Sequence, residues 1–205
     1  MVTIKTTAKM CLAATVLLAS SAFAEGLSWQ YVEVAYQQPS DHDIQGVEAR
    51  FSGHVAKKWV LQGRVNRVRL KESAVDLEMS QTRFDVSMGR IFSLTNRLDA
   101  LVSAGYTRLE YETELGTLKL DEGQHAGNVQ FGLRTGITDK FEAEASLSML
   151  FDDQDTSDLL WNARLRYRAI PVLSIVVGVS GIDSDVFDSN DILYEIGFRF
   201  DLGED

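Results

Sequence analysis

The segment Phe141–Phe151, FEAEASLSMLF, decides the fold class of this chain. Its odd-numbered positions carry Phe, Ala, Ala, Leu, Met and Phe, whereas the even-numbered positions up to 148 carry only Glu and Ser. Successive side chains of a β-strand point to opposite faces, and an α-helix would not separate two chemistries at adjacent positions in this way. We therefore predict a strand with one apolar and one polar face.

The same alternation recurs along most of the chain and predicts ten strands. Most of these runs exceed the about five or six residues of a typical globular strand. They also reach the about 9–11 residues that a tilted transmembrane strand needs. The strands are expected at residues 27–37, 43–55, 59–70, 79–92, 98–111, 124–137, 141–151, 158–168, 172–181 and 190–200.

The connections between these runs alternate in kind. Short periplasmic turns opposite longer extracellular loops, with an even number of strands, are typical of outer-membrane barrels. We predict an all-β fold: a closed antiparallel up-and-down transmembrane β-barrel of about ten strands, with eight as the alternative count. Short turns are expected at 57–58, 93–97, 138–140 and 170–171, and longer, acidic connections around 39–42, 72–76, 112–122, 152–156 and 182–190.

Residues 1–24 are predicted to be a cleaved signal peptide, which leaves 25–205 as the barrel domain. Lys5 and Lys9 precede an apolar run, and Ala22-Phe23-Ala24 matches the small-x-small cleavage pattern. The run is too short to span a bilayer of about 30 Å. A retained N-terminal anchor is the alternative.

The mature chain is acidic and lacks cysteine. Its single cysteine, Cys11, lies in the segment predicted to be removed, so neither disulfides nor thiolate metal sites are expected. Loss of that segment leaves 18 basic and 30 acidic residues, a formal net charge of −12. Nucleic acid is therefore not an expected partner, because its binding requires Lys and Arg to neutralise phosphates.

The charged residues of the polar face indicate which face lines the lumen. A lipocalin-like soluble barrel would show the same period with the faces exchanged. All cations on the polar face are arginines, whose rigid fork pairs with carboxylates, whereas the lysine ammonium stays strongly hydrated. We predict an inward-facing, paired network that leaves the lumen plugged or very narrow. Its members are Glu33, Glu48, Arg50, Arg64, Arg83, Asp85, Asp99, Arg134, Glu142, Glu144, Arg164, Arg166, Glu195 and Arg199.

The opposite, apolar face is expected to contact lipid. Aromatic residues near strand ends suit the girdles at the lipid–water interface. Three arginines, Arg67, Arg69 and Arg108, continue the apolar rows just above the outer hydrocarbon edge. Lipopolysaccharide presents phosphates at that height and arginine binds phosphate bidentately, although interfacial snorkelling without a specific partner is the alternative. The girdle candidates are Trp29, Tyr36, Tyr106, Trp161, Tyr167 and Tyr194.

The last predicted strand carries the most specific motif. Tyr194, Ile196, Phe198 and Phe200 alternate with polar residues, and the run 197–200 resembles the C-terminal strand signal of outer-membrane proteins. With this motif, the chain resembles small outer-membrane barrels of the OmpA/OmpX superfamily. The resemblance implies the cell outer membrane as the destination and the barrel-assembly machinery as a partner. It also implies an assembly signal at Tyr194, Gly197, Phe198 and Phe200, although residues 201–205 follow the aromatic end.

The sequence contains no strong catalytic, metal or cofactor motif. His42 and His125 stand in or beside the longer connections, where an Asp–His pair could activate water. The acidic runs at 152–155 and 183–191 offer oxygen ligands for calcium, but neither matches an EF-hand loop. We therefore predict a monomeric, non-enzymatic protein with a structural or surface-interaction role. A narrow channel and a barrel enzyme are the alternatives.

Overall fold

The computed structural model of the chain describes residues 27–39, 44–72, 77–115, 118–151, 157–183 and 192–203. The segment predicted to be cleaved, with Cys11, lies outside these ranges, as do His42 and the acidic residues of 152–155 and 184–191. The strands are β1 (Tyr31–Pro39), β2 (Ile44–Ala56), β3 (Trp59–Glu72), β4 (Leu77–Ser93), β5 (Leu98–Leu115), β6 (Leu118–Gly136), β7 (Phe141–Phe151), β8 (Ser157–Ile170), β9 (Leu173–Asp183) and β10 (Ile192–Asp201).

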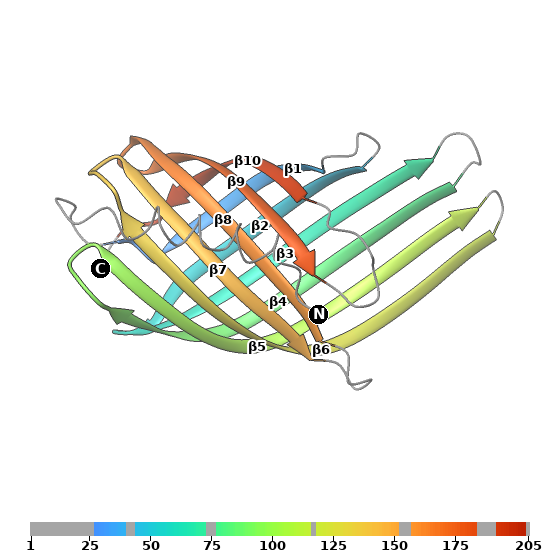
Figure 1. Cartoon of the computed structure of the whole chain (residues 1–205), viewed down its shortest axis with the longest axis horizontal. Helices are drawn as coiled ribbons and strands as arrows, with labels where there is room; N and C mark the ends of the chain where they lie inside the picture. The colour runs from blue at the N-terminus through green and yellow to red at the C-terminus, as the bar shows by residue number, and fades with distance from the viewer. Residues whose placement is uncertain are drawn as a thin grey trace.

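The ten strands close into one antiparallel barrel in which each strand pairs with its neighbours in the sequence and β1 pairs with β10 (Figure 1). This arrangement confirms the predicted ten-strand up-and-down barrel. The turns at 57–58, 94–97, 137–140 and 171–172 lie at one end of the barrel, called here the turn end. The opposite end is called the loop end. Within the described ranges, no helix is long and apolar enough to cross a membrane.

The two faces of the wall have opposite chemistry. Large apolar side chains point outward and stay exposed, as with Val86 at 52% and Phe198 at 53%. Charged side chains point inward and are buried, as with Glu33 and Arg134. A water-soluble barrel needs the reverse arrangement. The lipocalin-like alternative is therefore wrong, and the exterior is suited to lipid.

The strands differ greatly in length, and one sequence-based expectation fails for this reason. Strands β4, β5 and β6 have 17, 18 and 19 residues, whereas β1 and β10 have 9 and 10. The expected long loop at 112–122 is wrong, because β5 and β6 continue as a paired hairpin through most of it. In this hairpin the alternation continues with its phase reversed, since Glu110, Glu112 and Glu114 take outward positions and Leu109 and Tyr111 take inward ones, so the run was read as an acidic connection. The β3–β4 and β5–β6 hairpins project furthest at the loop end (Figure 1).

Candidate functional site

The centre of the lumen is occupied by Arg164 of β8, whose side chain is 0% exposed. Its Nη1 donates to Glu33 Oε1 on β1 at 2.6 Å, and its Nη2 donates to Glu48 Oε1 on β2 at 2.7 Å. The same Nη2 lies 2.8 Å from Glu195 Oε2 on β10. One guanidinium therefore joins four strands across the barrel. Gly178 of β9 leaves room for it, since a Cβ there would lie 2.9 Å from Arg164 Cγ.

Further ion pairs surround this centre. Arg166, next along the inner face of β8, binds Glu144 Oε2 of β7 through Nη2 at 2.5 Å. Its Nε lies 3.5 Å from Glu33 Oε2, which links the two arginines through one carboxylate. Arg50 forms an ion pair with Glu48. The predicted lumen residues of β1, β2, β7, β8 and β10 thus lie within one connected network.

A second group of ion pairs lies toward the turn end. Arg134 Nη2 binds Glu142 Oε2 at 2.5 Å, and Arg168 Nη2 binds Glu142 Oε1 at 2.9 Å. Arg199 Nη2 binds Asp201 Oδ1 at 2.7 Å. Sequence reasoning missed Arg168 and Asp201. It ended the eighth strand at Arg168 and the last strand at 200, whereas β10 continues for one more residue and turns Asp201 toward Arg199.

Residues 27–30 close the turn end from inside the barrel. Trp29 Nε1 donates to Asp99 Oδ2 at 2.9 Å, and the Ser28 carbonyl accepts from Arg134 Nη1 at 2.5 Å and Arg199 Nη2 at 2.6 Å. Trp29 is only 5% exposed and belongs to the apolar cluster completed by Val60, Ile91 and Leu101. The predicted strand start at 27 and the predicted girdle role of Trp29 are therefore wrong. An indole with one polar atom can be buried when that N–H has a partner, and here the partner is Asp99.

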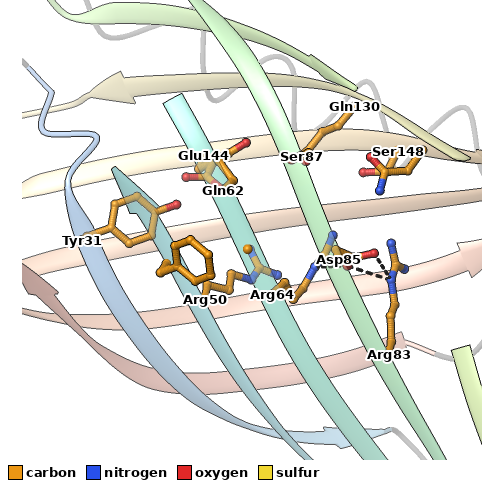
Figure 2. A pocket seen from close by; sticks show the side chains of 13 residues that line it. Tyr31, Arg50, Gln62, Arg64, Arg83, Asp85, Ser87, Gln130, Glu144 and Ser148 are labelled. Carbon is orange, nitrogen blue, oxygen red and sulfur yellow. Dashed lines mark hydrogen bonds and ion pairs between the residues drawn. The ribbon is translucent and has the colours of Figure 1, made fainter. Parts of the chain in front are cut away.

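A third group of charges lies on the wall formed by β3, β4 and β5. Asp85 Oδ2 is 2.8 Å from Arg64 Nε and 2.9 Å from Arg83 Nε, while Asp85 Oδ1 accepts from Thr107 Oγ1 at 2.5 Å. These residues border a lumen cavity of about 40 Å³. Figure 2 shows Arg50, Arg64, Asp85 and Arg83 along one side of it. The cavity is lined by Tyr31, Arg50, Phe51, Gln62, Gly63, Arg64, Arg83, Asp85, Ser87, Asn128, Gln130, Glu144 and Ser148.

The three arginines predicted to contact lipopolysaccharide share the outward face of β3 and β5. Arg67 pairs in register with Val47, an exposed outward residue. Arg67 Nη2 lies 3.1 Å from Glu112 Oε2, and Arg108 Nη2 lies 2.7 Å from Glu110 Oε1. Glu112 was missed because the fifth strand was expected to end at 111, and Glu110, inside that strand, was not assigned a role. Arg67, Arg69 and Arg108, with Glu110 and Glu112, are called here the outer arginine patch.

The remaining predicted residues divide between strands and undescribed segments. His125 lies on β6, where its Nδ1 is hydrogen-bonded to Tyr106 Oη and its ring stacks on Tyr106 at a centroid distance of 5.8 Å. Within the described ranges, no group of three or more His, Cys, Asp or Glu side chains is placed to hold a metal ion. On β10, Tyr194, Phe198 and Phe200 point outward and are exposed. Gly197 packs against Ala35 of β1, since a Cβ there would lie 2.7 Å from Ala35 Cα.

Comparison with known proteins identifies solved structures with a similar fold. No protein-family model and no curated protein sequence matches the chain. The solved NanC porin is similar at a TM-score of 0.53 and 13% identity, over 83% of this chain and 100% of that one. The translocator domain of the autotransporter NalP from Neisseria meningitidis is similar at a TM-score of 0.51 and 10% identity, over 96% of each chain.

The chain has the fold of an outer-membrane β-barrel. The Ail protein of Yersinia pestis is also similar, at a TM-score of 0.47 and 14% identity, over 86% of this chain and 100% of that one. The lumen of this barrel is not an open tube. Its interior is crossed by ion pairs at the centre and covered by Trp29 at the turn end.

Proposed function

We propose that the chain is a monomeric, non-enzymatic protein of the cell outer membrane, with a closed lumen and a structural or surface-interaction role. The proposal includes export of the chain through the signal peptide at 1–24. It also includes insertion by the barrel-assembly machinery, which would recognise the signal on β10. The observation that carries it is the filled interior. Arg164 bridges the lumen centre, and the Trp29 cluster covers the turn end.

Size supports the closed lumen over a transport role. Small-molecule pockets enclose about 300–1,000 Å³, and the lumen cavity beside Asp85 has about 40 Å³. An ion crossing the barrel would have to separate Arg164 from its carboxylates and displace Trp29 from Val60, Ile91 and Leu101. Separating buried ion pairs costs several kcal/mol. We therefore place the function on the outer surface and the projecting loop end.

Bilayer recording tests this proposal on the full mature chain, after a gel-mobility difference between unboiled and boiled samples has shown that the barrel is folded. The expected result is no resolvable conductance for the natural sequence. Trp29→Ala combined with Arg164→Ala is expected to admit small currents, since the pair removes both the cover at the turn end and the bridge at the lumen centre. The matched control is Trp59→Ala, which truncates an outward tryptophan that is 42% exposed. This variant is expected to show no conductance. Regular conductance steps from the natural sequence would replace this proposal with the narrow channel.

The outer arginine patch supplies a more specific candidate partner, the phosphates of lipopolysaccharide. A guanidinium has five N–H donors. Among the described residues, Arg67 forms its one ion pair with Glu112, and Arg108 forms its one ion pair with Glu110. Donors therefore remain for a phosphate. Both side chains are well exposed, at 40% and 53%, on the outward face toward the loop end.

A triple substitution tests the lipopolysaccharide contact. Arg67→Gln with Arg69→Gln and Arg108→Gln is expected to reduce the lipopolysaccharide that co-purifies with the folded barrel. Arg90→Gln, which changes an exposed outward arginine near the turn end, is the control and is expected to have no effect. Equal retention by the triple variant and the natural sequence would leave the patch as a site of interfacial snorkelling.

A further inference from the structure

Two arginines face each other directly on the inner wall of the barrel. Arg50 of β2 and Arg64 of β3 are register partners, so they occupy opposite positions on one face of the sheet. The row continues through Asp85 of β4 and Thr107 of β5. Like charges at directly opposite positions destabilise a sheet unless another charge compensates them. Arg50 has Glu48 for this purpose.

Arg83, the adjacent inward residue on β4, also binds Asp85, so the group of Arg64, Arg83 and Asp85 carries one excess positive charge. Arg64 and Arg83 both bind Asp85, and among the described residues no second carboxylate forms an ion pair with either. Asp85 Oδ1 also accepts a hydrogen bond from Thr107, whereas Oδ2 has only its ion-pair contacts with Arg64 and Arg83. Both guanidiniums lie largely out of solvent, with side chains 19% and 9% exposed. Unpaired charge in a confined site is costly.

The cavity beside these arginines offers the space and the neutral groups that a small anion needs. Gln62, Gln130, Ser87 and Ser148 line it with amide and hydroxyl groups. Glu144, across the cavity in Figure 2, is already held by Arg166. A water needs about 10–15 Å³ of such space, so about 40 Å³ admits an ion with one or two waters and excludes a sugar ring.

We propose that this cavity binds one small monovalent anion of halide type, held between the guanidiniums of Arg64 and Arg83. The anion supplies the charge that Asp85 alone does not, and it screens Arg50 from Arg64. The carboxylate of Glu144 disfavours a polyvalent anion such as phosphate, because it places a negative charge on the opposite wall. The site is separate from the outer arginine patch, which faces the exterior on β3 and β5.

Two measurements on the folded full-length mature chain test the site. Crystals soaked in bromide are expected to show one anomalous peak between Arg64 and Arg83, and crystals of Arg83→Gln are expected to lack it. In solution, chloride is expected to raise the unfolding midpoint above that in gluconate at equal ionic strength, since a ligand that binds only the folded state stabilises it. This difference is expected to vanish in Arg83→Gln. It should persist in Arg168→Gln, which alters a lumen arginine outside the cavity.

Three results would overturn the proposal. One is the absence of a lumen bromide peak in the natural sequence. Another is an equal midpoint in chloride and gluconate, and a third is an unchanged chloride effect in Arg83→Gln. If Arg83→Gln fails the gel-mobility test of folding, Arg64→Gln serves instead, since it removes the other guanidinium of the site. The bromide peak in the natural protein decides the matter on its own.

Discussion

Replacing Arg164 with methionine tests whether the lumen is closed, because the cost of the change depends on how dry the surroundings are. The substitution keeps much of the side-chain volume and removes the donors that hold Glu33, Glu48 and Glu195 at 2.6, 2.7 and 2.8 Å. Breaking a buried ion pair costs about 3–5 kcal/mol. In a water-filled lumen the same change would cost about 1 kcal/mol or less. The two descriptions of the interior therefore differ by a measurable amount.

The assay is urea unfolding of the barrel in lipid vesicles, followed by tryptophan fluorescence. With a slope of about 1–3 kcal/mol per molar urea, a loss of about 3–5 kcal/mol lowers the midpoint by at least about 1 M. Arg168→Met is the control, since its side chain is 34% exposed and, among the described residues, forms an ion pair only with Glu142. It is expected to cost about 1 kcal/mol or less.

A double variant separates lost pairing from lost packing. Without Arg164, Glu195 keeps only Gln37 as a hydrogen-bond partner among the described residues, at 3.5 Å. Glu195→Gln should therefore recover part of the stability that Arg164→Met removes, because it neutralises the carboxylate left unpaired. Equal midpoints for Arg164→Met and Arg168→Met would refute the dry, paired lumen, and the closed-lumen proposal would lose its main support.

Three further outcomes follow from the geometry. Val86→Arg and Leu147→Arg should each cost about 2–4 kcal/mol in vesicle unfolding, because an arginine facing lipid near the midplane is that unfavourable; tolerance of both would contradict the outward orientation. Gly178→Ala should cost about 1–3 kcal/mol through overpacking, since its Cβ would lie 2.3 Å from Glu195 Oε1. The control Gly53→Ala, whose Cβ would have nothing within 4 Å, should be nearly neutral in the same assay. Phe200→Ser should lower the amount of folded barrel in outer-membrane fractions by gel shift; an unchanged amount would remove this residue from the assembly signal.

The strand order and the assignment of faces could be predicted because both depend on local pattern. Where one face meets lipid and the other meets paired charges, the alternation is strong, as along Phe141–Phe151. The exclusive use of arginine on the polar face has a physical cause, since one guanidinium can satisfy several carboxylates at once. Arg164 does so with three. A lysine ammonium at that position would present a compact point charge rather than a planar fork.

The partners within the lumen could not be predicted, because they depend on register between distant strands. Arg164 and Glu33 are 131 residues apart in sequence. The β5–β6 extension was missed for a different reason: above the membrane region the outward face does not need to be apolar, so Glu112 and Glu114 were read as part of an acidic loop although the period of two continues. Trp29 was misplaced because an aromatic residue at a strand end has two suitable environments, the lipid interface and a capped lumen. Only the position of Asp99 decides between them.

The two ends of the barrel differ in how far they admit an ion to the lumen. At the turn end, Trp29 packs against its apolar neighbours and the Ser28 carbonyl accepts hydrogen bonds from the guanidiniums of Arg134 and Arg199, so both cover the lumen there. At the loop end, β4 to β6 extend past the shorter strands. An anion that reaches Arg64 and Arg83 must then enter from the loop end and leave by the same route. Such a site stabilises the wall without permitting transport, which makes an anion-binding lumen compatible with a barrel that does not conduct.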